Sequence, residues 1–392
     1  MRGAEAIRRE DERESQAQVH KTRTSPNVEC LDVTLDVLKL DRDTPIEGTA
    51  KAQELPLSYL ITFRCGIVLV MITWTVPSDM PVIAPGQLHG DLDIGCAGAC
   101  HVLEYRGHYV MYYWGSGKDG GYRVLKAEAP FDSPNAWQPC GAVLQPLPDL
   151  HYLARGPSFP MVAMVDDLNG FMYFGAWGVP RPDGKLSTRT GVAVTADGGK
   201  TWQYPLDRPV LQIEKPYEQV LTGSGCVFHC DGRFRMYYSA SKEYIDRPDG
   251  VQTGHGDLIP RVGVAYAESD DGLNWHKPFD DWIVSPRGFD TEPFEYICSQ
   301  PCVVEWGGGY VMWVSTFGHA YRIRSLTSND GITWEWVPSS PDGDLGIGKP
   351  GTFDDHQRSY AMVVPYGDEL RMWYSGNAFG GTGIGYAVGR DG

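Results

Sequence analysis

The chain has 392 residues and a formal net charge of −16, and its 12% aromatic residues stand beside 47 Gly and 28 Pro. This charge argues against nucleic acid or an anionic membrane as the main partner, because either would need a clustered basic surface. The Gly, Pro and aromatic content suits many short strands joined by tight turns, so long helices are not expected.

The N-terminal segment is rich in charge and lacks the apolar core of a signal peptide, so we expect a disordered tail over residues 1–28. Residues 57–76 are apolar enough to resemble a membrane span. Arg64 interrupts them and β-branched residues are frequent, which favours a buried strand. Residues 29–70 have no counterpart in the repeat described below, and we expect an extension that packs on the main domain.

The chain holds nine Cys, an odd number in a sequence without a secretory leader, which is typical of free thiols in a reducing cytoplasm. Three pairs are four residues apart: Cys96 and Cys100, Cys226 and Cys230, Cys298 and Cys302. Residues four apart on a strand are about 13 Å from each other, too far to share one tetrahedral ion. We therefore expect these thiols to pack rather than to bind metal.

One sequence unit recurs five times between residue 98 and the C-terminus, and each copy reads as a strand, a turn and a second strand. A methionine marks the second strand of every copy: Met111, Met172, Met236, Met312 and Met372. Repeats of this length suit one four-stranded blade each. The sequence therefore predicts an all-β fold, a five-bladed β-propeller with four-stranded antiparallel blades over residues 71–392.

In the three middle copies, a third strand leads into an acidic turn and a tryptophan, over residues 192–202, 264–275 and 323–334. Gly after the acidic residue supplies the positive φ of a tight hairpin, and the tryptophan begins an outer strand. The fifth copy ends without this tryptophan strand, but Met71–Trp74 matches Gly331–Trp334. We therefore expect the N-terminal segment to supply the outer strand of the last blade, which closes the ring and removes exposed sheet edges.

Residues 269–275, 321–334 and 372–377 resemble the blade signatures of the five-bladed glycosidase superfamily, which includes glycoside hydrolase families 32, 43 and 130. The resemblance covers residues 74 to 392. It implies the propeller scaffold and an enzyme that acts on a glycosidic bond. Blade signatures are mostly turn and packing residues, so they identify the scaffold better than the chemistry.

In a propeller, the residues just before each innermost strand face a shared axial funnel, and every copy of the unit offers ionisable or polar groups there. These are His89, Asp91 and Asp93; His151 and Arg155; Glu218 and Thr222; Glu292 and Glu295; and Asp354, Asp355, His356 and Arg358. Turn capping or pairing with arginine is the structural alternative for the carboxylates, above all for Asp91, Glu292 and Asp354. The two histidines His151 and His356 could equally be loop residues.

The resemblance implies three catalytic carboxylates, on blades one, two and three. Asp93, or its neighbour Asp91, matches the first by position, and Asp93 is the candidate base or nucleophile. Glu295 is the candidate acid, with Glu218 as a second candidate, because two carboxyl groups on opposite sides of a glycosidic bond can cleave it. Gly156 stands where the superfamily usually places the acid of blade two.

The remaining candidates are assigned to substrate binding. Arg155 and His356 would bind substrate hydroxyls or an anionic group, and Asp355 would modulate the charge of the site. Trp114, Trp177 and Phe317 lie just after second strands, where they could stack on a sugar. The full predicted binding set is Asp91, Trp114, His151, Arg155, Asp355, His356 and Arg358.

Three functions remain open at this stage. The first is a glycoside hydrolase acting on a small saccharide or glycosylated metabolite. The second is a non-hydrolytic propeller enzyme, such as a phosphorylase, lyase or cyclase, which the missing blade-two acid favours. The third is a non-catalytic carbohydrate-binding propeller. No cofactor is required, an axial calcium ion is left open, and a saccharide or other small molecule is the expected partner in the cytoplasm.

Overall fold

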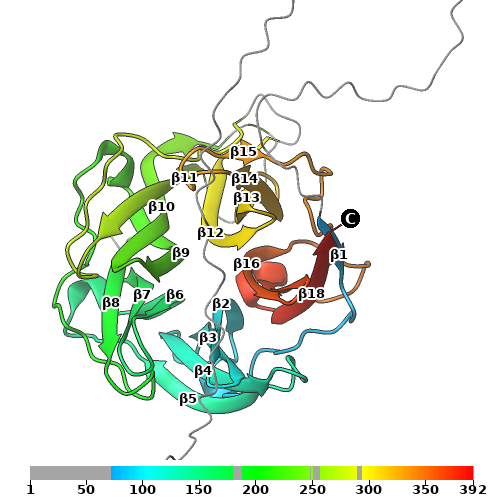
Figure 1. Ribbon diagram of the computed structural model, residues 1–392, viewed down its shortest axis with the longest axis horizontal. Helices are drawn as coiled ribbons and strands as arrows, with labels where there is room; N and C mark the ends of the chain where they lie inside the picture. Colours follow the sequence, from blue (N-terminus) through cyan, green and yellow to red (C-terminus); the bar gives the residue numbers. More distant parts are fainter. Residues whose placement is uncertain (1–71, 180–187, 248, 250–256, 289–293, 392) are drawn as a thin grey trace, which may run out of the picture. The chain divides into compact units, whose positions relative to one another are not determined.

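The computed structural model describes residues 72–179, 188–247, 249, 257–288 and 294–391. The expected tail (1–28) and extension (29–70) lie outside these residues. The described chain is almost entirely β-structure, with strands grouped around a central axis (Figure 1). Within it, no helix combines the length and the apolar character that crossing a membrane would need.

Blades one and two follow the predicted order of strands along the chain. Blade one consists of β2 (Cys96–Tyr105), β3 (His108–Ser116), β4 (Tyr122–Pro130) and β5 (Gln138–Leu144). Blade two consists of β6 (Gly156–Met164), β7 (Gly170–Trp177) and β8 (Thr188–Thr195), with a single bridge between Val194 and Gln203 at its outer edge. The outer strand predicted for blade two is thus reduced to one pairing.

Blades three and four are joined into one sheet by a single parallel pairing, Val262 with Ile297. Blade three consists of β9 (Leu221–Cys230), β10 (Arg233–Asp246) and β11 (Leu258–Ser269), and its predicted outer strand is reduced to two isolated bridges, Val264 with Val284 and Glu268 with His276. Blade four consists of β12 (Ile297–Trp306), β13 (Gly309–Phe317), β14 (Tyr321–Ser328) and β15 (Glu335–Trp336). The few helical turns are η1 (Gly90–Leu92), η2 (His151–Leu153), η3 (Pro216–Glu218) and α1 (Asn377–Gly380).

Blade five is built from both ends of the described chain, as predicted. It consists of β16 (Ser359–Tyr366), β17 (Glu369–Ser375), β18 (Ile384–Asp391) and, as the outer strand, β1 (Ile72–Thr75). β1 pairs antiparallel with β18, with Ile72 opposite Asp391 and Trp74 opposite Gly389. Figure 1 shows the blue and red ends of the chain side by side in this blade.

The recurring methionine is fully buried in every blade, and the aromatic residue that follows it contacts a tryptophan of the next blade. All of these contacts are edge to face: Tyr112–Trp202, Tyr173–Trp275, Tyr237–Trp334, Trp313–Trp74 and Trp373–Trp137, with ring centroids 5.9, 5.4, 6.1, 5.8 and 6.0 Å apart. Edge-to-face contact is a favourable geometry for aromatic rings. Trp74 therefore takes in blade five the place that the other tryptophans take, and Trp373 connects blade five to blade one.

A second repeated contact joins blades near the axis. The residue three positions after the methionine is serine in blades three, four and five, and its Oγ accepts a hydrogen bond from the backbone N–H of the next inner strand. The pairs are Ser239 with Gln300, Ser315 with Tyr360, and Ser375 with Ala99, at 2.9, 2.7 and 2.8 Å. Each of these N–H groups belongs to a left-handed residue at a bulge. In blades one and two the equivalent residues are Trp114 and Gly175.

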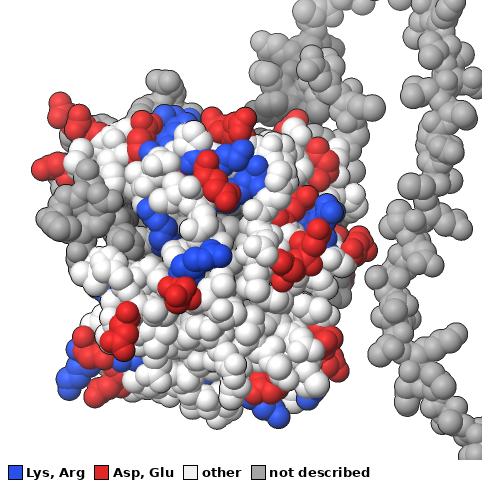
Figure 2. All heavy atoms as spheres, turned by 90° about the vertical axis from the view of Figure 1, so that its left-hand side faces the viewer, with Lys and Arg blue, Asp and Glu red and all other residues white. Residues whose placement is uncertain are grey.

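Of the six cysteines that are spaced four residues apart, five are free and buried, which confirms packing for them: Cys96, Cys100, Cys226, Cys298 and Cys302. Cys230 is exposed. The described residues contain no group of three or more His, Cys, Asp or Glu side chains arranged to hold a metal ion. On the side formed by blades two and three, basic and acidic side chains are interspersed (Figure 2). Ion pairs such as Lys215 with Asp280 occur there, at 2.7 Å.

Candidate functional site

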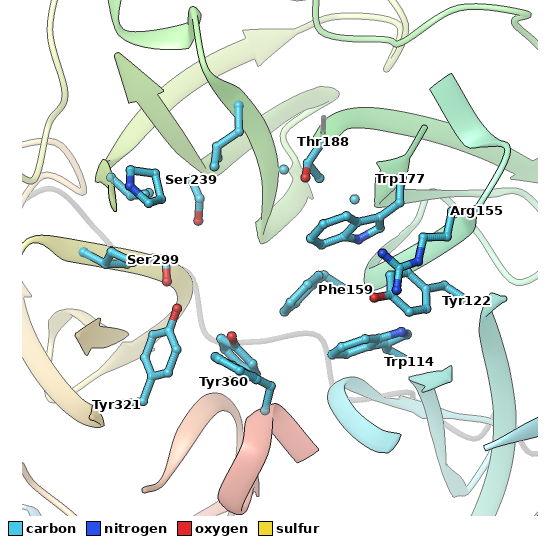
Figure 3. Close-up of a pocket in the computed structure, with 17 residues that line it drawn as sticks. Trp114, Tyr122, Arg155, Phe159, Trp177, Thr188, Ser239, Ser299, Tyr321 and Tyr360 are labelled. Carbon is cyan, nitrogen blue, oxygen red and sulfur yellow. The ribbon is translucent and has the colours of Figure 1, made fainter. Parts of the chain in front are cut away.

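A cavity of about 340 Å³ lies where the inner strands of the five blades converge (Figure 3). This volume is at the lower end of the range for ligand pockets. Every blade contributes to its lining: Trp114, Tyr122, Arg155, Phe159, Gly175, Trp177, Thr188, Leu221, Gly223, Ser239, Pro260, Val262, Ile297, Ser299, Tyr321, Tyr360 and Phe379. None of these residues is Asp or Glu.

Aromatic rings form a continuous arc around the cavity, each in contact with the next. The successive pairs are Trp177–Tyr122, Tyr122–Trp114, Trp114–Phe159, Phe159–Tyr360, Tyr360–Tyr321 and Tyr321–Phe379, with centroids 5.5, 5.1, 5.4, 5.0, 5.3 and 5.7 Å apart. Phe159 and Tyr360 are the left-handed residues of their inner strands, so the bulges turn their rings toward the axis. The arc is therefore built by backbone geometry as well as by residue choice.

The hydroxyl groups of Ser239, Ser299 and Tyr321 lie on the side of the cavity opposite Arg155 and Trp114 (Figure 3). The rings of Tyr321 and Tyr360 are in contact, with centroids 5.3 Å apart, and Ser299 lies beside Tyr321. Burial raises the pKa of Tyr321 and of Tyr360, so both hydroxyls stay protonated near neutral pH. This side of the cavity thus offers neutral donors and acceptors.

Arg155 is the one charged residue among the described residues that line the cavity. Its guanidinium carbon lies 4.3 Å from the centre of the Tyr122 ring, and the side chain is exposed at the cavity mouth. Among the described residues it forms neither an ion pair nor a side-chain hydrogen bond. The backbone holds it in place, because its N–H donates to Trp177 O at 2.9 Å and its carbonyl accepts from the Tyr122 N–H at 2.8 Å.

The next residue, Gly156, is buried with a φ of +115°, a conformation that disfavours any side chain. A Cβ at this position would lie 2.0 Å from the carbonyl oxygen of Tyr122. The absence of the expected acid at this point in blade two is therefore built into the backbone. No Asp can occupy position 156 without moving the chain around Tyr122.

The predicted catalytic carboxylates Asp93, Glu218 and Glu295 are 0%, 0% and 2% exposed and do not line the cavity. Each accepts a hydrogen bond from a hydroxyl in the second strand of its own blade, and Asp354 of blade five does the same. The pairs are Asp93 with Tyr113, Glu218 with Tyr238, Glu295 with Thr316, and Asp354 with Tyr374, at 2.7, 2.8, 2.8 and 2.7 Å. The catalytic role of Asp93, Glu218 and Glu295 stays a prediction. All four hydrogen bonds connect the segment before the inner strand to the second strand of the same blade, so we call these four residues anchoring carboxylates.

Blade two lacks both members of this acid–hydroxyl pair. The tyrosines of blades one, three and five stand two positions after the repeated methionine, where blade two has Phe174. Phe174 is fully buried and offers no hydroxyl, and Ala154 stands where the spacing would place the acid. The joint loss supports an anchoring role for the pair, because an unpartnered tyrosine or acid would be costly at a buried site.

Three of the anchoring carboxylates also pair with a cation. Glu218 lies 2.8 Å from Lys277 Nζ, and both side chains are inaccessible or nearly so. Arg358 donates through Nε to Asp354 at 2.7 Å, and Arg324 does the same to Glu295 at 2.6 Å. The Oε2 atom of Glu295 has no hydrogen bond among the described residues, and Arg287 lies 3.7 Å away from it.

The other predicted binding residues do not line the cavity. Asp91 and His151 are exposed, in η1 and η2, and His356 is exposed before β16. Asp355 accepts hydrogen bonds from the Gly351 N–H and from Asn377 Nδ2, which lower its pKa. Arg358 is buried against Asp354. Glu292, also considered above, lies outside the described residues.

Of the predicted site residues, the structure brings Trp114 and Arg155 together at the cavity. The sequence reasoning named Trp177 as a possible sugar-stacking residue but missed the rest of the aromatic arc: Tyr122, Phe159, Tyr321, Tyr360 and Phe379. A signal for two of them was present, because Phe159 and Tyr360 occupy equivalent places in the repeat, immediately after Ser158 and Ser359. The prediction was based on charged residues before each inner strand, whereas Phe159 and Tyr360 lie within their inner strands.

The sequence matches no protein-family model. It is 34% identical over 158 residues to the uncharacterized protein MT1551 of Mycobacterium tuberculosis strain CDC 1551, and 33% identical over 158 residues to the uncharacterized protein Rv1502 of strain H37Rv. These stretches are 40% of this chain and 47% of each relative. The matched region therefore spans about half the length of the curated relatives.

Solved structures resemble the fold over most of the chain. A glycoside hydrolase has a TM-score of 0.59 at 18% identity, covering 80% of this chain and 91% of that one. A glycosyl hydrolase from Bacteroides ovatus has a TM-score of 0.58 at 15% identity, covering 82% and 94%. A structure from work on the GH130 mannoside phosphorylases and glycoside hydrolases has a TM-score of 0.56 at 15% identity, covering 82% and 94%. The chain thus shares the β-propeller fold of these solved structures.

Proposed function

We propose that this protein is a saccharide-binding propeller, and that its axial cavity holds a sugar of a saccharide or glycosylated metabolite. The observation that carries the proposal is the aromatic arc from Trp177 to Phe379 around a cavity of about 340 Å³. The fold supports it, because solved structures of this fold include glycoside hydrolases.

The cavity offers the two kinds of contact that a sugar ring needs. The flat faces of Trp114 and Phe159, stacked at an interplanar angle of 28°, suit the C–H faces of a pyranose. Ser299, Tyr321 and Tyr360 supply neutral hydroxyls for sugar hydroxyl groups. Ligand sites commonly combine apolar walls with a few polar groups that fix orientation in this way.

Arg155 favours a saccharide that carries a carboxylate or phosphate. A guanidinium binds such groups through charged hydrogen bonds, which are stronger than neutral ones. Arg155 has no acidic partner among the described residues, and Tyr122 supports it from one side. The cation is therefore free to meet an anionic group at the cavity mouth.

Glycoside hydrolysis is the second candidate function, and Glu295 is the residue on which it would depend. Its Oε1 is held by Arg324 and Thr316, whereas Oε2 has no hydrogen bond among the described residues. Cleavage in this superfamily needs two carboxyl groups about 5 to 9.5 Å apart across the substrate. The described lining of the cavity contributes neither, so we rank hydrolysis below binding.

Binding and turnover can be measured on the same panel of methyl glycosides of glucose, mannose and glucuronic acid. We expect calorimetric binding of at least one glycoside by the native protein and its loss in Trp114→Ala, with no product. Absence of binding by a correctly folded native protein would contradict the proposal. Product formation that Glu295→Gln abolishes would establish the hydrolase instead.

A further inference from the structure

Two glycines face each other across the boundary between blades two and three, inside the cavity. A Cβ on Gly223 would lie 3.5 Å from Thr188 Cγ2 and 3.6 Å from Gly175 Cα. A Cβ on Gly175 would lie 3.2 Å from Ser158 Oγ. Neither glycine has a positive φ. At Gly223 neither the backbone nor crowding requires glycine, so its effect is to leave space.

That space lies where the repeated contact between blades is interrupted. In blades three, four and five a serine at this position bonds to the next inner strand, as Ser239 does to Gln300 at 2.9 Å. Gly175 stands in its place in blade two and supplies no hydroxyl. The space left by the two glycines therefore widens the cavity at the boundary between blades two and three, beside Thr188, and we call this space the extension.

Most of the side chains that blades three and four contribute to the cavity lining are apolar, while Thr188, Ser239 and Ser299 carry hydroxyl groups. The apolar ones are Leu221, Pro260 and Val262 of blade three and Ile297 of blade four. A sugar ring placed against them would lose hydrogen bonds to water without replacement, which costs free energy. A hydrocarbon group in the same place would gain by leaving water.

We propose that the natural ligand is a glycoside with an apolar aglycone, whose sugar lies against Trp114 and Arg155 and whose aglycone occupies the extension beside Gly175 and Gly223. This inference rests on the proposed saccharide binding and adds the chemical class of the second half of the ligand. The two halves of the cavity then match the two halves of one amphipathic molecule.

The test compares methyl and hexyl β-glycosides of the same sugars by isothermal titration calorimetry. Burial of each additional methylene group raises affinity about fourfold, so we expect hexyl glycosides to bind at least about tenfold more tightly than methyl glycosides. Gly223→Leu should bring this ratio close to one by filling the extension. Gly223→Ala, whose Cβ makes only ordinary contacts, controls for folding through its thermal midpoint.

Arg155→Met provides the matched comparison at the other end of the cavity. It should weaken the methyl and hexyl glucuronides by the same factor and preserve their ratio. Equal affinities of native protein for methyl and hexyl glycosides would overturn the apolar extension while leaving saccharide binding intact. Hexanol binding without any glycoside binding, or no binding at all, would overturn both.

Discussion

Arg155 lies over the ring of Tyr122, with its guanidinium carbon 4.3 Å from the ring centre, and the Tyr122 N–H donates to the Arg155 carbonyl at 2.8 Å. Tyr122 thus holds Arg155 at the cavity mouth twice, through its ring and through its backbone N–H. A cation held in this way needs little reordering when an anion arrives, which favours binding.

Replacing Arg155 with methionine keeps much of the length of the side chain and removes its charge. We expect the affinity for methyl glucuronide to fall about 10- to 100-fold, because a hydrogen bond to a charged group contributes about 1.5 to 3 kcal/mol. Calorimetric titration measures the change. Arg233→Met, at an exposed ion pair with Asp270, serves as the control. A comparable loss for methyl glucoside would refute the assignment of Arg155 to an anion.

Glu218 is predicted to act on stability through its buried contact with Lys277. Glu218→Gln should lower the free energy of unfolding by about 3 to 5 kcal/mol, because it removes the buried carboxylate and leaves the buried lysine charge with only the half-exposed Glu214. Glu214→Gln removes a second, half-exposed carboxylate 3.2 Å from the same lysine and should cost less than about 1 kcal/mol. Urea denaturation of both variants decides the matter. Equal small losses would show that Glu218 does not anchor the blade.

Gly156 cannot be replaced without disturbing β4. Gly156→Ala should destabilise the protein by at least about 3 kcal/mol, since a positive φ and a contact with the Tyr122 carbonyl act together. Gly223→Ala should change stability by less than about 1 kcal/mol, because its Cβ meets only ordinary contacts. Thermal unfolding compares the two. If Gly156→Ala melted like the native protein, the backbone would not exclude an acid there.

His101 makes stability depend on acid pH. Burial in β2 lowers its pKa to about 4, below the ordinary 6.5, so the folded protein keeps the ring neutral. As the pH falls below 6.5 the unfolded chain takes up the proton first, and stability falls until the folded group titrates near 4. We expect a loss of up to roughly 3 kcal/mol over this window relative to His101→Gln. Parallel profiles for the two proteins would contradict it.

Much of the fold could be predicted because each blade of a propeller corresponds to one copy of a sequence repeat. The buried methionine, the acidic turn and the tryptophan recur at equivalent places, so the missing piece of blade five could be recognised at Trp74. The edge-to-face contact of Trp74 with Trp313 then agrees with the contacts in the other blades.

The site was harder to predict because it depends on where side chains turn, not on which residues occur. Asp93 and Glu218 were expected at the funnel from their positions before the inner strands. Whether they face the funnel depends on Tyr113 and Tyr238, each 20 residues further along the chain. Phe159 reaches the axis through a bulge, and a bulge leaves little trace in the order of residues.

The pairing of β1 with β18 also constrains how the protein is made. β1 is synthesised before every blade, yet its hydrogen-bonding partner is the final strand of the described chain. Until that strand leaves the ribosome, β1 has an unsatisfied edge, and Trp74 has no blade-five sheet to lie on. Blades one to four can assemble in order as they emerge. The ring therefore closes in one late step, when β18 pairs with β1. A nascent chain that stalls before β18 would expose an unpaired strand edge, which can pair with other chains and aggregate.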